Sequence, residues 1–179
     1  MFDKKKPSVV VIGAGATGCG VARDLALRGC AVTLVEQDMP GMGSSARFHG
    51  LLQSGARYAV SDPHYAAECM RERNIISRIA PQAVDPMGGV FIVLPDDPRD
   101  YPQRFVKGCQ KAKIPCQSSE PQQLMAEQPA ISREIQQAFV VPDAALNPWR
   151  LINLLCDDIR RHQGQIITLH RVEKLRPEP

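Results

Sequence analysis

Three glycines and one acid near the start of the chain have the residue types and the spacing that hold a dinucleotide. Residues 9–18 read as a buried strand that runs into a glycine-rich turn, and a helix and a second strand then lead to Glu36. Gly13 permits a tight turn, Gly15 lets the backbone approach a pyrophosphate, and Gly18 lets helix and strand pack closely. The helix start offers N–H groups to phosphates, and Glu36 can accept ribose hydroxyls. We therefore predict an adenine-dinucleotide site. The alternative is a turn between core elements with no ligand.

A second segment with potential chemistry follows the second strand. Residues 41–58 are rich in small side chains and show neither a helical nor a strand period, so we expect a loop with short turns. Irregular segments of this length are usually functional or disordered. Leu51 and Leu52 look buried, and aromatic residues lie in the same stretch. These features favour a functional loop.

Composition limits the other kinds of site. The chain has 179 residues, 44% hydrophobic and 23% charged, which is typical of one ordinary globular domain. A net charge of +3 gives no indication of nucleic-acid binding. The six cysteines form no C-x-x-C pair and the four histidines no H-x-x-x-H pair, so we expect no metal and reduced thiols. No apolar run approaches the ~20 residues of a membrane span and no signal peptide is visible, so we expect a cytoplasmic protein.

The elements that position these residues follow from periodicity and caps. Helix signals begin at Asp62-Pro63 and at Asn147-Pro148, where an N-cap residue precedes a proline. Gly164 is expected to end the second of these helices. Asp24 and Arg28 stand four residues apart on the first helix, which predicts an ion pair. The remaining elements are expected as helices at about 102–113 and 119–129 and as strands at 90–94, 114–116, 139–142 and 165–172.

Two motifs resemble a known family. Residues 12–29, IGAGATGCGVARDLALRG, resemble the signature of FAD-dependent glycerol-3-phosphate dehydrogenases, with Ala14 at a position where glycine is usual. Residues 49–60, HGLLQSGARYAV, are similar to a segment of the A subunit in the anaerobic branch of that family. The similarity extends over nearly all 179 residues, but over only the N-terminal third or so of such a subunit.

This resemblance implies a fold. It is an α/β, Rossmann-like FAD-binding fold of the FAD-dependent, D-amino acid oxidase-like oxidoreductase superfamily, and we expect it in truncated form. The superfamily builds its FAD domain from separate segments. We expect residues 1–80 to be its first segment, 81–139 a partial substrate or cap domain, and 140–179 a returning segment.

The resemblance also implies an activity. Members oxidise sn-glycerol 3-phosphate to dihydroxyacetone phosphate and pass the electrons to a quinone, in glycerol metabolism and anaerobic respiration. For the anaerobic form, the resemblance implies a multi-subunit complex at the inner face of the cytoplasmic membrane. Two alternatives remain open: a truncated product without catalysis, and a flavin oxidoreductase acting on another hydroxy or amino acid.

The resemblance gives roles to individual residues. Arg57 is expected to bind the substrate through charge-assisted hydrogen bonds, with Tyr58 as a further donor. His49 is expected at the flavin ring, and it is a candidate base. The alternatives are a surface arginine beside a core tyrosine, a packed histidine and a flexible loop. The residues expected to contact FAD are Gly13, Gly15, Ala16, Thr17, Gly18, Glu36, Gly43, Ser44, Ser45, His49 and Val172.

Overall fold

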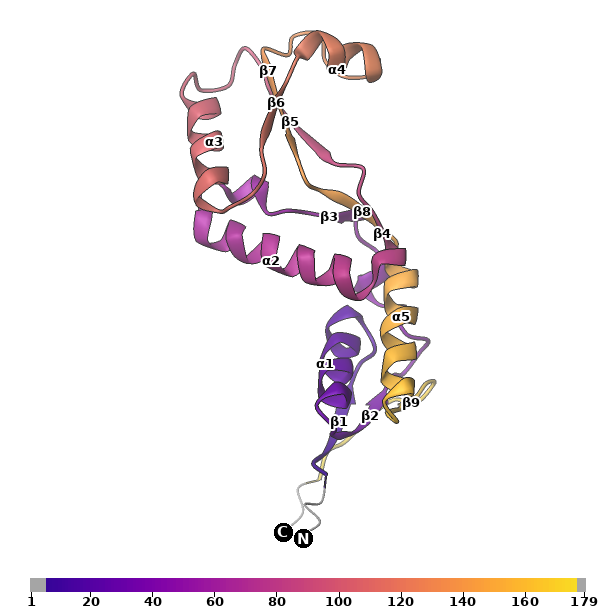
Figure 1. Ribbon diagram of the computed structural model, residues 1–179. Helices are drawn as coiled ribbons and strands as arrows, with labels where there is room; N and C mark the ends of the chain where they lie inside the picture. Colours follow the sequence, from indigo (N-terminus) through magenta and orange to yellow (C-terminus); the bar gives the residue numbers. More distant parts are fainter. Residues whose placement is uncertain (1–5, 177–179) are drawn as a thin grey trace. The chain divides into compact units, whose positions relative to one another are not determined.

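The computed structural model describes residues 6–176, so the outermost ends of the expected first and returning segments, 1–5 and 177–179, lie outside the described residues. The chain forms two compact units (Figure 1). The first unit combines Met1–Gly50 with Asn147–Pro179, and the second is Leu51–Leu146. Our expected division at 80/81 and 139/140 follows the family's domains rather than compactness, and it stays a prediction.

The first unit is built on a parallel sheet in the order β1-β2-β9. Its elements are β1 (Ser8–Ile12), α1 (Ala16–Leu27), β2 (Ala31–Val35), a 3-10 turn (Ser44–Ala46), α5 (Pro148–Arg161) and β9 (Gln165–Ile167). The central strand β2 supplies the buried Val32 and Leu34, because alternate side chains of a strand point to the same face. This βαβ arrangement is the α/β, Rossmann-like architecture that the sequence predicted.

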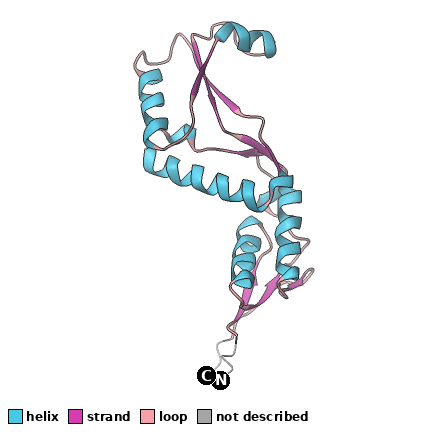
Figure 2. Ribbon diagram, in the orientation of Figure 1, coloured by secondary structure: helices cyan, strands magenta, loops and turns pink. Residues whose placement is uncertain are grey.

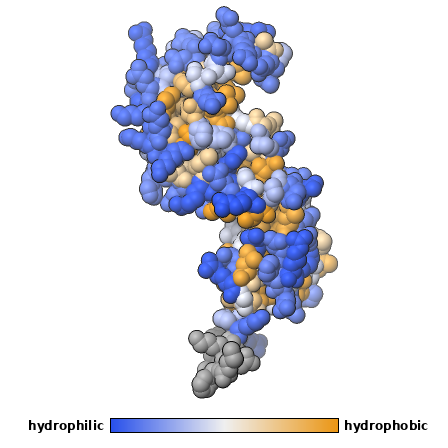
Figure 3. Space-filling model, in the orientation of Figure 1, coloured by the Kyte–Doolittle hydropathy of each residue, from blue (hydrophilic) through white to orange (hydrophobic). Residues whose placement is uncertain are grey.

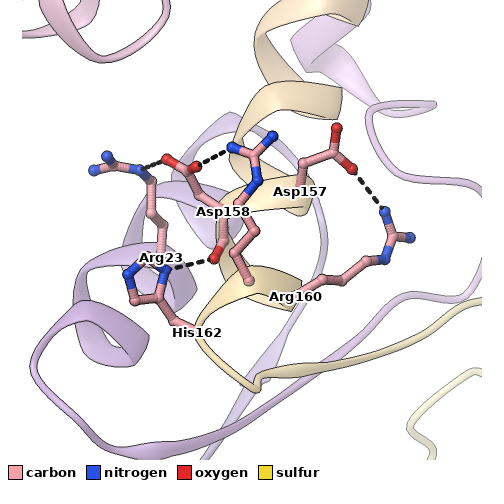
Figure 4. A network of polar contacts seen from close by, with 6 residues as sticks. Arg23, Asp157, Asp158, Arg160 and His162 are labelled. Atoms are coloured by element: carbon pink, nitrogen blue, oxygen red, sulfur yellow. Dashed lines mark hydrogen bonds and ion pairs between the residues drawn. The ribbon is translucent and has the colours of Figure 1, made fainter.

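Helices α1 and α5 pack against each other in the first unit. The Nε of Arg23 on α1 donates to Asp158 Oδ2 on α5 at 2.7 Å, and both side chains are about four-fifths buried. Arg161 Nη1 approaches the other oxygen of the same carboxylate at 3.0 Å. Figure 4 shows this network, together with the Asp157–Arg160 pair at 3.2 Å. The network fixes the contact between the two helices.

The second unit contains two three-stranded sheets, β3-β8-β4 and β5-β7-β6, whose pairings are all antiparallel (Figure 2). Its strands are β3 (Leu51–Leu52), β4 (Val84–Asp85), β5 (Gly89–Val93), β6 (Gln117–Ser119), β7 (Gln137–Val141) and β8 (Ala144–Leu146). Its helices are α2 (Pro63–Ile79), α3 (Tyr101–Lys111) and α4 (Pro121–Glu127), with 3-10 turns at Ala56–Tyr58 and Pro81–Ala83.

The core of the second unit centres on Phe105 of α3, which is 1% exposed. Its ring centroid lies 4.7 Å from that of Phe91 on β5 and 5.6 Å from that of Phe139 on β7. Not all apolar groups of this unit are covered, because Val90 and Val140, a cross-strand pair of β5 and β7, remain about 40% exposed. Figure 3 shows apolar side chains among polar ones at the molecular surface.

Both predicted helix starts are confirmed. Asp62 accepts a hydrogen bond from the backbone N–H of Tyr65, and Asn147 accepts one from that of Arg150. The Asp24–Arg28 ion pair is also present, at 2.6 Å. The segment 41–58 consists of loop, two 3-10 turns and the two-residue strand β3, close to the loop and short turns that we expected.

Two expectations of burial are wrong, because Leu51 is 43% exposed and β1 leaves Val10 and Ile12 more than half exposed. Three expectations about secondary structure are also wrong. The strand predicted at 165–172 ends at Ile167, because its partner strand β2 ends at Val35 and Leu169 then turns with φ 59°. Residues 114–116 are not a strand, since pairing with β7 begins only at Gln117. At the end of α5 the left-handed residue is Gln163, with φ 66°, and Gly164 follows it and donates its N–H to Ile159.

No helix within residues 6–176 is long and apolar enough to cross a membrane.

Candidate functional site

The glycine loop between β1 and α1 carries the geometry that the motif predicted. Gly13 has φ +98°, which favours glycine, and its N–H donates to Val35 O at 2.8 Å. A Cβ at Gly18 would collide with the carbonyl oxygen of Gly13, so this glycine allows α1 to pack against the end of β1. Gly15 is the N-cap residue of α1 and has no side chain that could cap the helix.

The start of α1 is suited to an anion. The first N–H groups of a helix have no partner within the helix and concentrate a partial positive charge. No acidic residue lies in the first turn of α1. A Cβ on Gly15 would lie 2.9 Å from Ser45 Oγ, so the glycine makes room for that hydroxyl beside the loop. The helix start and the absence of an acid in its first turn are therefore suited to the charge of a pyrophosphate.

Ser45, from the segment that follows β2, contacts the glycine loop. Its hydroxyl oxygen accepts a hydrogen bond from the Ala16 N–H at 2.9 Å and so caps the first turn of α1 from outside the helix. The same segment is held at Gly41, whose N–H donates to Ala14 O at 2.9 Å. A Cβ at Gly41 would lie 2.6 Å from Ile152 of α5, and the residue has φ +85°. Sequence reasoning missed Gly41. The one sequence signal for Gly41 is its place in the segment of small residues at 41–58.

Glu36 lies beside the same loop. Its Oε2 accepts from the Ala14 N–H at 2.7 Å, and its Oε1 accepts from the Asp38 N–H at 2.9 Å. A carboxylate oxygen can accept more than one hydrogen bond, so lone pairs remain for ribose hydroxyls. The chain after β9 returns to this acid, because the His170 N–H donates to Glu36 O at 2.9 Å.

The structure thus brings together the glycine loop, Ala16, Ser45 and Glu36. Thr17 belongs to the same first turn, and Gly43 and Ser44 belong to the segment that carries Ser45. Val172 lies beyond the last strand, is 36% exposed, and keeps its cofactor role only as a prediction. His49 is exposed, with its ring centroid 5.6 Å from that of Phe48. Its two predicted roles also stay predictions.

Arg57 and Tyr58 belong to the second unit, on the 3-10 turn Ala56–Tyr58. Arg57 is exposed, and its Cζ lies 5.2 Å from the centre of the Tyr58 ring, within reach of a cation–π contact. The Tyr58 ring packs edge-on against Tyr65 of α2 at 4.9 Å. Arg57 is therefore exposed on a turn whose aromatic side chain, Tyr58, is packed against α2.

Three contacts fix the turn that carries Arg57. Gly55 has φ +90°, and a Cβ there would lie 2.5 Å from Ala66 O, so the chain passes directly against α2. A Cβ at Gly108 would collide with the carbonyl group of Ala59. Before the turn, the N–H of the fully buried Ser54 donates to Asp143 Oδ1 at 2.6 Å. Asp143 was not among the predicted site residues, although it directly follows the strand that we placed at 139–142.

No group of three or more metal-ligating side chains occurs among residues 6–176. A hollow of about 500 Å³ in the second unit lies beside α3 and β7 and is lined by Gln103, Lys107 and Phe139 among others. None of its lining residues is one that we predicted to bind a cofactor or a substrate.

Residues 8–179 match the family model described as FAD dependent oxidoreductase. The chain is 42% identical over 173 residues to the A subunit of the anaerobic glycerol-3-phosphate dehydrogenase of Escherichia coli (strain K12), a match that covers 97% of this chain and 32% of that protein. It is 45% identical over 148 residues to the A1 subunit of the same enzyme from Haloferax volcanii, which covers 83% of this chain and 25% of that one. The chain therefore spans a third or less of these relatives.

The fold has counterparts among solved structures. The L-alpha-glycerophosphate oxidase of Mycoplasma pneumoniae, solved with FAD bound, superposes with a TM-score of 0.74 at 17% identity. The match covers 92% of this chain and 45% of that one. At this identity the likeness concerns the fold.

Proposed function

Because this chain belongs to the family of FAD-dependent oxidoreductases, we propose that it is the N-terminal part of the catalytic subunit of an anaerobic-type glycerol-3-phosphate dehydrogenase. The reaction is the oxidation of sn-glycerol 3-phosphate to dihydroxyacetone phosphate, with quinone as the final electron acceptor. The observation that carries the proposal is 42% identity to such an enzyme over 97% of this chain. A glycine loop whose geometry fits a dinucleotide supports it.

The first unit holds the cofactor in this proposal. Apart from the Ala16 N–H, which donates to Ser45, the first-turn N–H groups of α1, including that of Thr17, would bind the pyrophosphate. Glu36 would accept hydrogen bonds from the ribose hydroxyls. Gly43 and Ser44 present backbone and hydroxyl groups to the rest of the cofactor. Bound FAD supplies the acceptor for the hydride that leaves the alcohol carbon.

Arg57 and Tyr58 bind the substrate in this proposal. A guanidinium can form paired, charge-assisted hydrogen bonds to a phosphate or a substrate hydroxyl. The turn that carries Arg57 is fixed at Ser54, Gly55 and Ala59, which reduces the entropy lost when the side chain takes hold of a ligand. His49 is the candidate that accepts the hydroxyl proton, because an unprotonated imidazole nitrogen can act as a general base.

The electron path and the location are part of the same proposal. The E. coli relative is one subunit of its enzyme, which supports the presence of partner subunits. We propose that these partners carry electrons to the quinone and hold the chain at the inner face of the cytoplasmic membrane.

An absorbance experiment tests the cofactor and the substrate in turn. The purified chain is mixed with FAD, freed of excess by gel filtration, and then given sn-glycerol 3-phosphate without oxygen. We expect a retained oxidised-flavin band that the substrate bleaches and that glycine, an amino-acid control, leaves unchanged. A chain that retains no flavin contradicts the cofactor site, and bleaching by glycine contradicts the substrate.

The Arg57→Ala variant separates substrate binding from cofactor binding. It should retain FAD as well as the parent chain, because it alters the second unit only. It should need at least tenfold more substrate for half-maximal bleaching, since a charged hydrogen bond is worth about 1.5–3 kcal/mol. An unchanged substrate requirement contradicts the role of Arg57.

A further inference from the structure

Two thiols lie in contact where α1 packs against α5. The Sγ of Cys19 is 3.9 Å from the Sγ of Cys156, although the two residues are 137 positions apart in sequence. Both side chains are buried, at 0% and 2% exposure. A disulfide bond is about 2.05 Å long, so a closure of roughly 2 Å would join the two sulfurs.

The two thiols differ in acidity. The two thiols share a hydrogen bond in which either sulfur can be the donor; this contact raises the pKa of Cys19, and burial raises it further. The same hydrogen bond lowers the pKa of Cys156 and outweighs the effect of burial, which raises it; the charges of Arg160 and Asp157 act in opposite directions. Cys156 is therefore the sulfur that more readily becomes the thiolate, the nucleophilic form.

Both thiols are covered by the packing of α1 against α5, with Cys19 0% and Cys156 2% exposed. An oxidant therefore has to reach the pair through a transient opening of the α1–α5 contact, and we expect hydrogen peroxide to do so more readily than a bulkier disulfide reagent.

We propose that Cys19 and Cys156 form an oxidisable dithiol, a site that hydroperoxides convert into a disulfide clamp between α1 and α5. The Cys156 thiolate attacks one peroxide oxygen, the O–O bond breaks, and with hydrogen peroxide a sulfenic acid and one water result. The Cys19 sulfur then attacks the Cys156 sulfur, the S–O bond breaks, and a second water leaves. In sum, two thiols lose two electrons and two protons, and one hydrogen peroxide is reduced to two waters.

The clamp acts on the first turn of α1. Cys19 directly follows Gly18, the glycine that packs against Gly13 in the loop. A covalent bond to α5 adds to the Arg23–Asp158 ion pair one turn further along α1. The oxidised chain should therefore unfold at a higher temperature, because the cross-link closes a long loop in the unfolded state.

Peptide mapping tests the proposal directly. Trypsin places Cys19 alone in the peptide of residues 6–23 and Cys156 alone in that of residues 151–160, so their disulfide gives one unambiguous cross-linked mass. The native chain is treated with hydrogen peroxide, remaining thiols are blocked, and the digest is read by mass spectrometry. We expect the 6–23/151–160 cross-link, its loss after dithiothreitol, and a melting temperature several degrees above that of the reduced chain.

Matched variants give the controls. Cys19→Ser and Cys156→Ala should each abolish the cross-link and the thermal shift. Cys109→Ser should preserve both, because Cys109 lies on α3 in the second unit, where burial raises its pKa to about 12. The proposal is overturned if the folded parent chain, checked by circular dichroism, oxidises at other cysteines without this cross-link. It is also overturned if Cys19 and Cys156 pair indiscriminately with the other thiols. Both of these outcomes are measured on the parent chain, so the test does not depend on whether a variant folds.

Discussion

At the residue scale, Gly18 and Gly20 stand two positions apart on α1 but meet different surroundings. A Cβ at Gly18 would collide with the backbone of Gly13, which cannot move without opening the loop. A Cβ at Gly20 would enter open space. The motif glycine is therefore required by packing, and its neighbour is not.

We expect Gly18→Ala to lower the free energy of unfolding by about 1–3 kcal/mol, the usual cost of forcing atoms into a packed contact. Gly20→Ala should leave it unchanged or raise it by up to about 1 kcal/mol, since alanine is the better helix former. Urea titrations followed by circular dichroism measure both. Equal losses in the two variants would contradict the assigned contact between Gly18 and Gly13.

Asp143 stabilises the second unit through one hydrogen bond. It accepts the N–H of Ser54, a donor that is buried and remote from water. Gly89 makes room for this carboxylate, because a Cβ there would lie 2.8 Å from the Asp143 Cβ. The contact joins the end of β7 to the segment just before Arg57.

We expect Asp143→Ala to cost about 1–3 kcal/mol of stability, because it leaves a buried donor without an acceptor. Asp143→Asn keeps an acceptor oxygen of the same reach and should cost less. Amide hydrogen exchange of residues 54–58 should accelerate in the alanine variant and remain near the parent rate in the asparagine variant. Identical exchange in all three chains would show that Asp143 does not hold this turn.

At the element scale, α1 and α5 are joined by a partly buried ion pair with a matched control on the same helix. Arg23 and Asp158 are about four-fifths buried, whereas the side chains of Arg28 and Asp24 are mostly exposed. Water and salt screen an exposed pair far more than a buried one.

Arg23→Gln should therefore destabilise the chain by about 1.5–3 kcal/mol, the usual worth of a hydrogen bond to a charged group. Arg28→Gln should produce no measurable change. Thermal melts at low and high salt provide the check. A salt-sensitive loss in Arg28→Gln, or none in Arg23→Gln, would contradict this account of the α1–α5 contact.

The sequence predicted those elements whose signals are local. The strand–glycine–helix unit and the helix caps at Asp62 and Asn147 depend on neighbouring residues, and all were found. The end of β9 depends instead on the length of β2, which the alternating pattern of residues 165–172 does not contain. Strand β8 is only three residues long and exists through its partners β3 and β4, so it escaped prediction.

The same distinction applies to the candidate site. The motif alone indicated Gly13, Gly18 and Glu36, because their spacing is set within one βαβ unit. The contact of Ser45 with Ala16 spans 29 residues and that of Asp143 with Ser54 spans 89. No local pattern encodes such pairings, since tertiary packing decides which distant segments meet.

At the scale of the whole molecule, the residues that fit FAD are concentrated in one of two compact units. The glycine loop, Ser45 and Glu36 belong to the first unit, and so does β1, whose Val10 and Ile12 side chains remain more than half exposed. An apolar strand with so much exposed surface contributes little hydrophobic stabilisation of its own. The first unit should therefore gain the most from a ligand.

Cofactor binding should consequently protect the two units unequally. With free FAD at 100 times its dissociation constant, mass action adds about 2.7 kcal/mol to the unfolding free energy of the unit that binds it. Amides of residues 6–50 and 147–176 that exchange through unfolding of the first unit should then slow by roughly 100-fold, while those of residues 51–146 slow less. Hydrogen exchange read by mass spectrometry measures both sets in one experiment, and adenosine monophosphate, which lacks the pyrophosphate, serves as the weaker control ligand. Equal slowing throughout the chain would mean that the units unfold as one, and slowing confined to residues 51–146 would place the cofactor site outside the glycine loop.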